Sequence, residues 1–155
     1  MTEEEADVAV RGILRDLGLS FTEDTPRGGD LYLWTGNQFH IGEMTAANII
    51  HEIAHWLVAT EEERNTPEFN LGLAPEPGCR TLSRKMPKKE AQCKECMASV
   101  LGIQIELTLG LPWEKTHSMH GWSDTDQSFE DRVALLKGKG FLNAEGRPTF
   151  LKVPE

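Results

Sequence analysis

The sequence predicts an α+β fold built from an N-terminal helix, a small β-hairpin or sheet, a histidine-bearing helix and a following glutamate-bearing helix. Three observations lead to this prediction. Apolar residues recur at helical spacing in several separate stretches. Two short β-rich segments flank a turn-forming tetrapeptide. Two histidines stand four positions apart within one of the helical stretches. At 155 residues the chain can bury a real core, so we expect one domain over 1–155.

The first predicted helix begins with a capping box, in which Thr2 and Glu5 each satisfy a backbone N–H group of the other residue. Its apolar stripe is Ala6, Val10, Ile13, Leu14 and Leu17, and Gly18 ends it. Residues 19–22 form a candidate strand.

A β-hairpin is predicted next, with strands 31–34 and 39–41 joined across Thr35-Gly36-Asn37-Gln38. The hairpin runs directly into the next helix. It could border a cleft and hold an extended substrate by strand addition, or it could only pack against that helix.

The central motif is His51-Glu52-Ile53-Ala54-His55, an H-E-x-x-H pattern on a helix predicted from about residue 45 to 60. Because His51 and His55 are four positions apart, their rings project from one face and can converge on one ion. Imidazole nitrogens bind zinc at about 2.0–2.1 Å. Glu52 points to the side of this pair, where a carboxylate can accept the proton of a metal-bound water. The residues that would face the core are Ala47, Ile50, Ala54, Leu57 and Val58.

After Thr60 the prolines and glycines predict about 25 irregular residues, and a second strong helix begins near Pro87. This helix offers two candidates for a third ligand. Glu90 shares a face with an apolar stripe, where a carboxylate is costly unless it is paired or metal-bound. Glu95 lies on another face, beside small residues. On this face argument we choose Glu90 over Glu95.

A third helix is predicted through Phe129 to Gly138, capped by Ser123 or Asp124, and the tail after it could fold back as a turn. Between the last two helices lies a segment with His117 and His120. These histidines are expected in a loop, although they could also enter the site.

Composition excludes several classes of function. The net charge of −9 argues against a nucleic-acid partner. No apolar run approaches the roughly 20 residues of a membrane span, and the acidic start is not that of a signal peptide, so we expect a cytoplasmic protein. Three cysteines, Cys79, Cys93 and Cys96, fit a reducing interior, and we expect them to pack rather than to bind metal.

The segment His51-Glu52-Ile53-Ala54-His55-Trp56-Leu57-Val58-Ala59 resembles the elongation factor P hydroxylase family, and the resemblance continues through Arg64 to Glu68-Phe69. Weaker echoes lie at Glu90–Glu95 and Phe129–Val133. Glu90-Ala91-Gln92 also resembles the ImmA/IrrE-type metallopeptidases, whose third ligand is a glutamate in a similar context. Both resemblances imply a minimal zincin-like α+β fold with His51, His55 and a helical glutamate at the metal.

The two resemblances imply different chemistry. The first implies a redox metal, iron, that inserts oxygen into a lysine-derived side chain of a protein. The second implies zinc, water and amide cleavage. We predict a zinc-dependent metallohydrolase of the metallopeptidase type, acting on a protein or peptide, with ligands His51, His55 and Glu90 and with Glu52 as general base.

Hydrolysis would also need a group that stabilises the oxyanion, for which Arg64, His117 and His120 are candidates. Two alternatives remain: the iron-dependent hydroxylase, and a non-enzymatic domain that binds metal structurally or binds a partner. A closed site with four protein ligands would favour the last, and an open coordination position would favour an enzyme.

Overall fold

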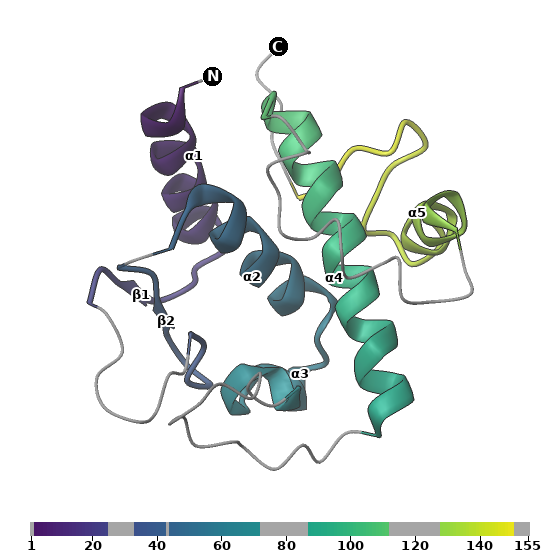
Figure 1. Ribbon diagram of the computed structural model, residues 1–155, viewed down its shortest axis with the longest axis horizontal. Coiled ribbons are helices and arrows are strands. Elements are labelled where there is room, and N and C mark those ends of the chain that lie inside the picture. Colours follow the sequence, from purple (N-terminus) through teal and green to yellow (C-terminus); the bar gives the residue numbers. More distant parts are fainter. Residues whose placement is uncertain (1, 25–32, 43, 72–86, 112–127, 151–155) are drawn as a thin grey trace.

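The computed structural model describes residues 2–24, 33–42, 44–71, 87–111 and 128–150. Within these ranges the chain has a mixed, mainly helical α+β architecture with one small sheet (Figure 1). The elements are α1 (Glu3–Asp16), β1 (Phe21–Thr22), β2 (Phe39–His40), α2 (Ala46–Val58), α3 (Glu61–Arg64), a 3-10 helix η1 (Pro67–Asn70), α4 (Lys88–Leu109) and α5 (Phe129–Gly138).

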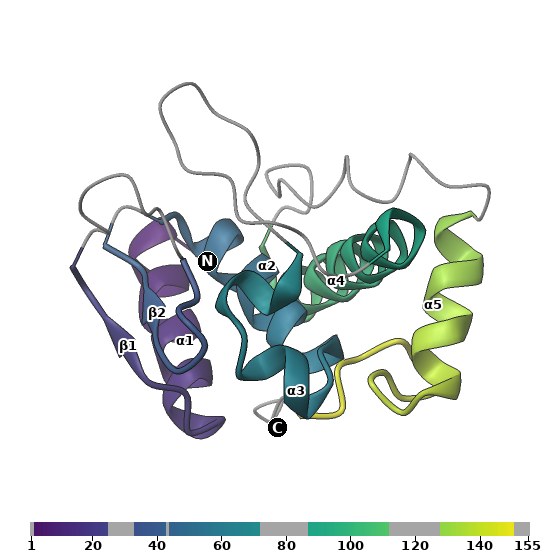
Figure 2. The same cartoon turned by 90° about the horizontal axis from the view of Figure 1, so that it is seen from below.

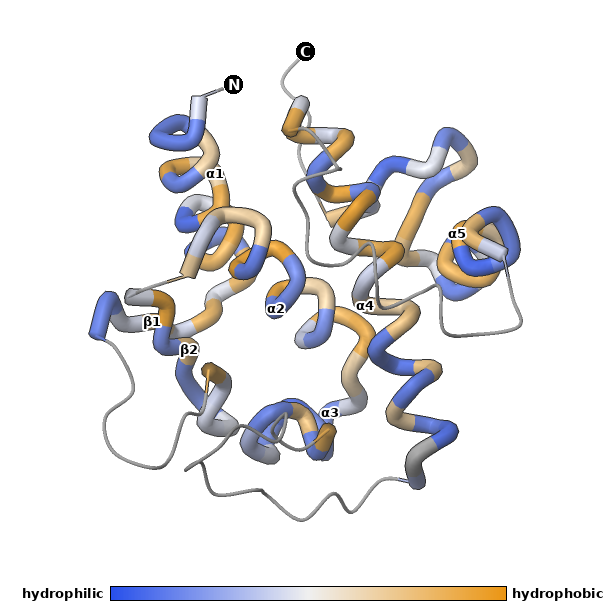
Figure 3. Tube along the Cα trace, viewed as in Figure 1, coloured by the Kyte–Doolittle hydropathy of each residue, from blue (hydrophilic) through white to orange (hydrophobic). Residues whose placement is uncertain are grey.

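Helix α2 lies at the centre of the arrangement. Figures 1 and 2 show α1 and the two strands on one side of α2, and α4 followed by α5 on the other side. Helix α2 packs against both α1 and α4, while α5 packs against α4. Along α1 and α2 hydrophobic residues recur between hydrophilic ones, as expected for helices that bury one face (Figure 3). The central helix is therefore held from two sides.

The core is aliphatic around α2 and aromatic beside the sheet. Ile50 and Ile53 of α2 are fully buried, as are Val10 and Leu14 of α1. The prediction for α2 was partly right, because Ile50, Ala54 and Val58 are buried, but Ala47 and Leu57 are only half-buried. Burying one aliphatic side chain of this size contributes about 1.5–3 kcal/mol.

The predicted N-terminal helix and its capping box are confirmed, since the Thr2 hydroxyl accepts from the Glu5 backbone N–H and the Glu5 carboxylate accepts in return. The hairpin is confirmed over its described part by the antiparallel bridge between Trp34 and Phe39. Strand β2 also pairs in parallel with β1, with Phe21 opposite Phe39. The small sheet thus joins the chain after α1 to the segment that leads into α2.

The later helices differ from prediction mainly at their ends. Helix α4 begins after Pro87 as expected and ends at Gly110, whose φ of 79° suits a glycine cap. Helix α5 begins at Phe129 and is capped by Ser128, so the predicted cap at Ser123 or Asp124 is wrong. The stretch predicted as irregular after Thr60 contains α3, which Thr60 and Glu63 begin with a capping box.

Several predictions fall outside the described residues. They concern the loop 25–30, strand residues 31 and 32, Cys79, the segment 117–122, and the last residue of the tail. The tail residues that are described do fold back, since Leu142 bridges Pro148 and the Gln104 side chain donates to the Gly146 carbonyl at 3.2 Å. Within the described chain, the helices are too short or too polar to cross a lipid bilayer.

Candidate metal centre

The two histidines of the H-E-x-x-H motif lie on the side of α2 that faces α4. Helix α2 begins at its cap Thr45, whose hydroxyl accepts from the Asn48 backbone N–H at 3.3 Å. His51 and His55 follow one turn apart, with ring centroids 4.5 Å apart and planes at 90°. Their Nε2 atoms approach to 2.9 Å. The predicted convergence of the two imidazoles is therefore present.

A carboxylate from α4 completes the cluster. Glu95 Oε1 lies 2.8 Å from His51 Nε2, and Glu95 Oε2 lies 3.0 Å from His55 Nε2. Burial alone would raise the pKa of Glu95, but charge on His55 and the hydrogen bond with His51 outweigh it and hold that pKa well below its usual range. Among the described residues, His51, His55 and Glu95 form the one group of three or more metal-ligating side chains whose ligand atoms all lie within 4.8 Å of one another.

The geometry brings Glu95, and not the predicted Glu90, to the two histidines. Glu90 lies in the first turn of α4 and is exposed to solvent. Five residues along a helix correspond to about 500°, so the side chains of Glu90 and Glu95 point in directions about 140° apart and are separated by about 7.5 Å along the axis. Only Glu95 reaches the histidines.

The face argument failed because most sides of α4 are buried. Val100, Leu101, Ile103 and Ile105 of this helix are all 2% exposed or less, so an apolar stripe does not single out the side facing α2. A better signal is the set of small residues at i+3, i+4 and i+7 from Glu95, which permits close helix approach; these residues are Ala98, Ser99 and Gly102.

Glu52 lies between the two candidate ligands in sequence, and its pKa is strongly shifted. Burial, followed by the negative charge of Glu68, raises the pKa of Glu52 to about 8, while His51 lowers it and Glu95 raises it further. A cation held by the histidines would lower this pKa by direct Coulombic attraction. The protonation of this carboxylate thus depends first on its burial and then on the charge of the neighbouring groups.

An aromatic stack contacts the ring of His55. The ring of Phe69 stacks on His55 with centroids 5.8 Å apart and planes at 14°. Phe69 also stacks on Trp34 at 5.6 Å, and Trp34 contacts Phe39 of β2 at 4.5 Å. The small sheet is therefore linked to a candidate ligand through consecutive ring contacts.

The backbone that presents Phe69 is unusual. Glu68, Phe69 and Asn70 have φ values of 51°, 54° and 64°, in the left-handed region that non-glycine residues rarely adopt. Each such residue costs on the order of 1 kcal/mol or more, so surrounding contacts must hold the turn. Sequence reasoning assigned no role to Glu68 or Phe69, and the only sign was that the resemblance described above extended to them.

Glu68 makes some of the contacts that stabilise this left-handed turn. Its buried Oε1 accepts the backbone N–H groups of Leu33 and of Trp34, the latter at 3.0 Å. The Trp34 carbonyl in turn accepts from the Glu68 N–H at 2.9 Å, and the Leu33 carbonyl accepts from His40 at 2.9 Å. Every backbone hydrogen-bonding group of Leu33 and Trp34 is occupied, so these two residues cannot hold a substrate by strand addition.

The candidates for oxyanion stabilisation receive no support from the described residues. The Arg64 guanidinium stacks over the Trp56 ring at 3.7 Å and donates to the Trp56 and Leu57 carbonyls. His117 and His120 lie outside the described residues. Of the described cysteines, Cys96 is fully buried and Cys93 half-buried, and neither forms a disulfide within the described residues, which agrees with the expectation that they pack.

The three side chains fit a divalent metal by donor type and by spacing. Ligands about 2.0–2.1 Å from a tetrahedral zinc ion are separated by roughly 3.3–3.4 Å, so separations of 2.8–3.0 Å need to widen by only a few tenths of an ångström. Comparison with known proteins adds no family, since no family model, curated protein or solved structure matches the chain.

Proposed function

We propose that this protein is a zinc-dependent metallohydrolase, of the metallopeptidase type, with His51, His55 and Glu95 as ligands and Glu52 as general base. The observation that carries the proposal is the convergence of two imidazole nitrogens from α2 and one carboxylate from α4. Three protein ligands leave a coordination position for water, which is the arrangement of catalytic rather than structural zinc sites. The zincin-like fold and the protein or peptide substrate belong to the same proposal.

Each residue has a distinct task in this mechanism. A bound zinc ion would supply Lewis acidity and an acidic water ligand. His51 and His55 would hold it through Nε2, and Glu95 would offset its charge. Glu52, next to the ligands but outside the cluster, would accept a proton from the attacking water and pass it to the leaving group. Burial and the charge of Glu68 raise the pKa of Glu52, and a cation on the histidines would lower it again, so the carboxylate could both accept and release a proton.

A second candidate function is an iron-dependent hydroxylase that acts on a protein side chain. Two histidines and one carboxylate are also the donor set of non-haem Fe(II) oxygenases. The resemblance to the elongation factor P hydroxylase family extends to Phe69, which stacks on His55. These two observations keep iron as the alternative metal.

The deciding experiment begins with elemental analysis of protein purified without added metal. We expect close to one equivalent of zinc per chain, lost in His51→Ala and His55→Ala. Incubation of the zinc form with a peptide library, followed by mass spectrometry, should reveal hydrolysis that is absent in both variants.

Iron with dioxygen-dependent addition of one oxygen atom to a protein would decide for the hydroxylase. Metal retained by both histidine variants would overturn the site. A parent protein that binds zinc through a fourth protein ligand and cleaves nothing would favour the non-enzymatic domain.

A further inference from the structure

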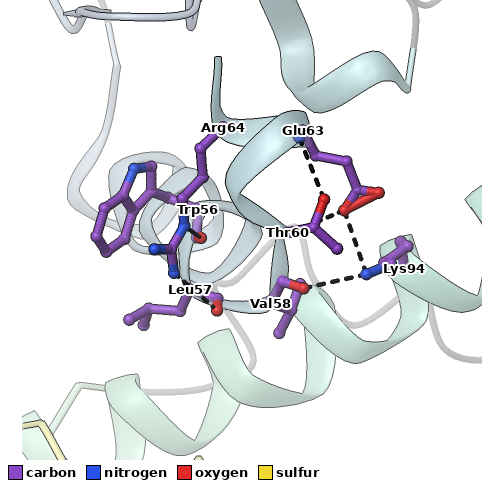
Figure 4. Close-up of polar contacts among 7 residues, drawn as sticks. All are labelled: Trp56, Leu57, Val58, Thr60, Glu63, Arg64 and Lys94. Atoms are coloured by element: carbon purple, nitrogen blue, oxygen red, sulfur yellow. Dashed lines mark hydrogen bonds and ion pairs between the residues drawn. The ribbon is translucent and has the colours of Figure 1, made fainter. Parts of the chain in front are cut away.

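Two positively charged side chains from other parts of the chain donate hydrogen bonds to the last carbonyl groups of α2. A helix leaves its last four carbonyl groups without intrahelical donors. In α2 the His55 carbonyl accepts from the Ala59 N–H at 3.0 Å. Arg64 donates to the next two carbonyls, those of Trp56 and Leu57, at 2.8 and 3.3 Å. The last carbonyl, that of Val58, accepts from the Lys94 ammonium at 3.2 Å (Figure 4).

Through Lys94, α4 therefore binds the C-terminal end of the histidine-bearing helix α2. Its Nζ also lies 3.2 Å from Glu63 Oε1. The same Glu63 oxygen accepts from the Thr60 N–H at 2.9 Å in the capping box of α3, which fixes the carboxylate (Figure 4). Both side chains of the ion pair are largely buried, at 22% exposed for Lys94 and 12% for Glu63. One ammonium thus joins α2, α3 and α4.

Lys94 immediately precedes Glu95, the ligand that α4 contributes. Neighbouring residues on a helix point about 100° apart. Lys94 reaches the Val58 carbonyl at the end of α2, while Glu95 reaches His51 near its middle and His55 in its last turn, so the two side chains fix α4 against α2 at two points. Rotation or sliding of α4 that withdrew the Glu95 carboxylate would also break the contacts of Lys94. Lys94 and His55 line the same small pocket, which confirms that the two contacts are close together.

We propose that Lys94 is a positioning residue for the metal centre, which holds α4 in the rotation that brings Glu95 to His51 and His55. This inference rests on the proposed metal site. Glu63 contributes to this positioning, because its carboxylate holds the Lys94 ammonium in place. It also neutralises a positive charge that would otherwise lie beside a cation site.

A positioning role and simple electrostatics predict opposite changes in zinc affinity for the substitution Lys94→Met. Lys94→Met keeps the length and apolar stem of the side chain and removes one positive charge near the site. By Coulomb's law alone, a divalent cation would then bind more tightly. If Lys94 positions Glu95, the same variant binds zinc more weakly, by about tenfold, the lower end of the range for groups that orient metal ligands.

The test measures zinc affinity by competition with a chromophoric chelator, together with the visible absorption of the cobalt-substituted protein. Lys94→Arg should restore most of the parent affinity, because a guanidinium can also donate to the Val58 carbonyl and pair with Glu63. The matched control is Arg11→Met. Arg11 pairs with Glu23 at 2.7 Å between α1 and the end of β1, on the other side of α2. It should lower stability without changing zinc affinity or the cobalt spectrum.

Weaker zinc binding and an altered cobalt spectrum in Lys94→Met, with rescue by Lys94→Arg, would support the proposal. Unchanged or tighter zinc binding in a folded Lys94→Met protein would overturn it while leaving the proposed function intact. If Lys94→Met does not fold, Lys94→Gln carries the same test, because its shorter, uncharged side chain loses the ion pair with Glu63. A parent protein without zinc affinity would overturn the proposed function and this inference together.

Discussion

The Nε2 atom of His51 lies 2.8 Å from Oε1 of Glu95, although the two residues are 44 positions apart in sequence. This single distance joins the central helix to α4. The contact comes from the long packed interface between the two helices, since Glu95 lies in the second turn of α4 and has no sequence neighbour at the site. The identity of the candidate third ligand therefore depends on helix packing and on the rotation of α4 about its axis.

The first prediction separates the two glutamates of α4. Glu95→Ala should reduce zinc affinity by more than the roughly 10–100-fold typical of outer-shell changes, because it removes a ligand. Glu90→Ala should leave zinc affinity unchanged, since Glu90 is exposed and away from the histidines. Competition with a chromophoric chelator measures both variants. A larger effect of Glu90→Ala would restore the original face argument.

Local features of the fold were predictable because short-range rules determine them. The capping box of Thr2, the helix start at Thr45 and the pairing of Trp34 with Phe39 all follow from residues a few positions apart. The H-E-x-x-H spacing likewise placed His51 and His55 together. In each case the partners lie on one element or across one turn.

Long-range features were not predictable in the same way. The third ligand depended on the rotation of α4, and a helix buried on most sides gives no clear apolar stripe. The turn at Glu68 and Phe69 has left-handed backbone at residues that give no glycine signal. Its stability comes from Leu33 and Trp34, which precede it by more than 30 residues.

The second prediction concerns Glu68. Glu68→Ala should lower the free energy of unfolding by roughly 2–3 kcal/mol, because the backbone N–H groups of Leu33 and Trp34 would both lose their acceptor. Glu68→Gln should cost less, since its amide oxygen can accept the same hydrogen bonds. Urea denaturation of the metal-free proteins measures both. Equal losses in the two variants would mean that the negative charge, and not the acceptor, holds the strand.

The third prediction is a pH dependence of the ion pair between Arg11 and Glu23. The hydrogen bonds from Arg11 hold the pKa of Glu23 below its ordinary value of 4.5. A depressed acid pKa stabilises the folded state above the unfolded-state pKa, and this stabilisation disappears as pH falls through the folded-state pKa.

The stability difference between the parent and Arg11→Met should therefore be largest at neutral pH and shrink in acid below 4.5. Because Glu23 is largely exposed, the pH-dependent part should stay below about 1 kcal/mol. Urea titrations at neutral pH and in acid measure this stability difference. The difference between the parent and Glu23→Gln should shrink in acid in the same way. A difference that persists unchanged in acid would show that packing of the Arg11 stem, and not its charge, stabilises the fold.

The last prediction tests Glu52, on which the hydrolytic mechanism depends. Glu52 lies next to His51 in sequence but outside the group of converging ligand atoms. Glu52→Gln keeps the size and hydrogen-bonding capacity of the side chain and removes its ability to accept a proton. The variant should bind zinc as tightly as the parent, while turnover falls by the roughly 10²–10⁴-fold typical of losing a general base.

Metal analysis and a turnover assay on the peptide found in the library screen, run on the same preparation of Glu52→Gln, separate the possible roles of this carboxylate. Loss of zinc from the variant would make Glu52 a ligand, which contradicts its place beside the cluster. Retained zinc with unchanged turnover would exclude water activation by Glu52, because no proton acceptor would remain at that position. In that case peptide hydrolysis would not depend on a base next to His51, and another group would have to accept the proton of the attacking water.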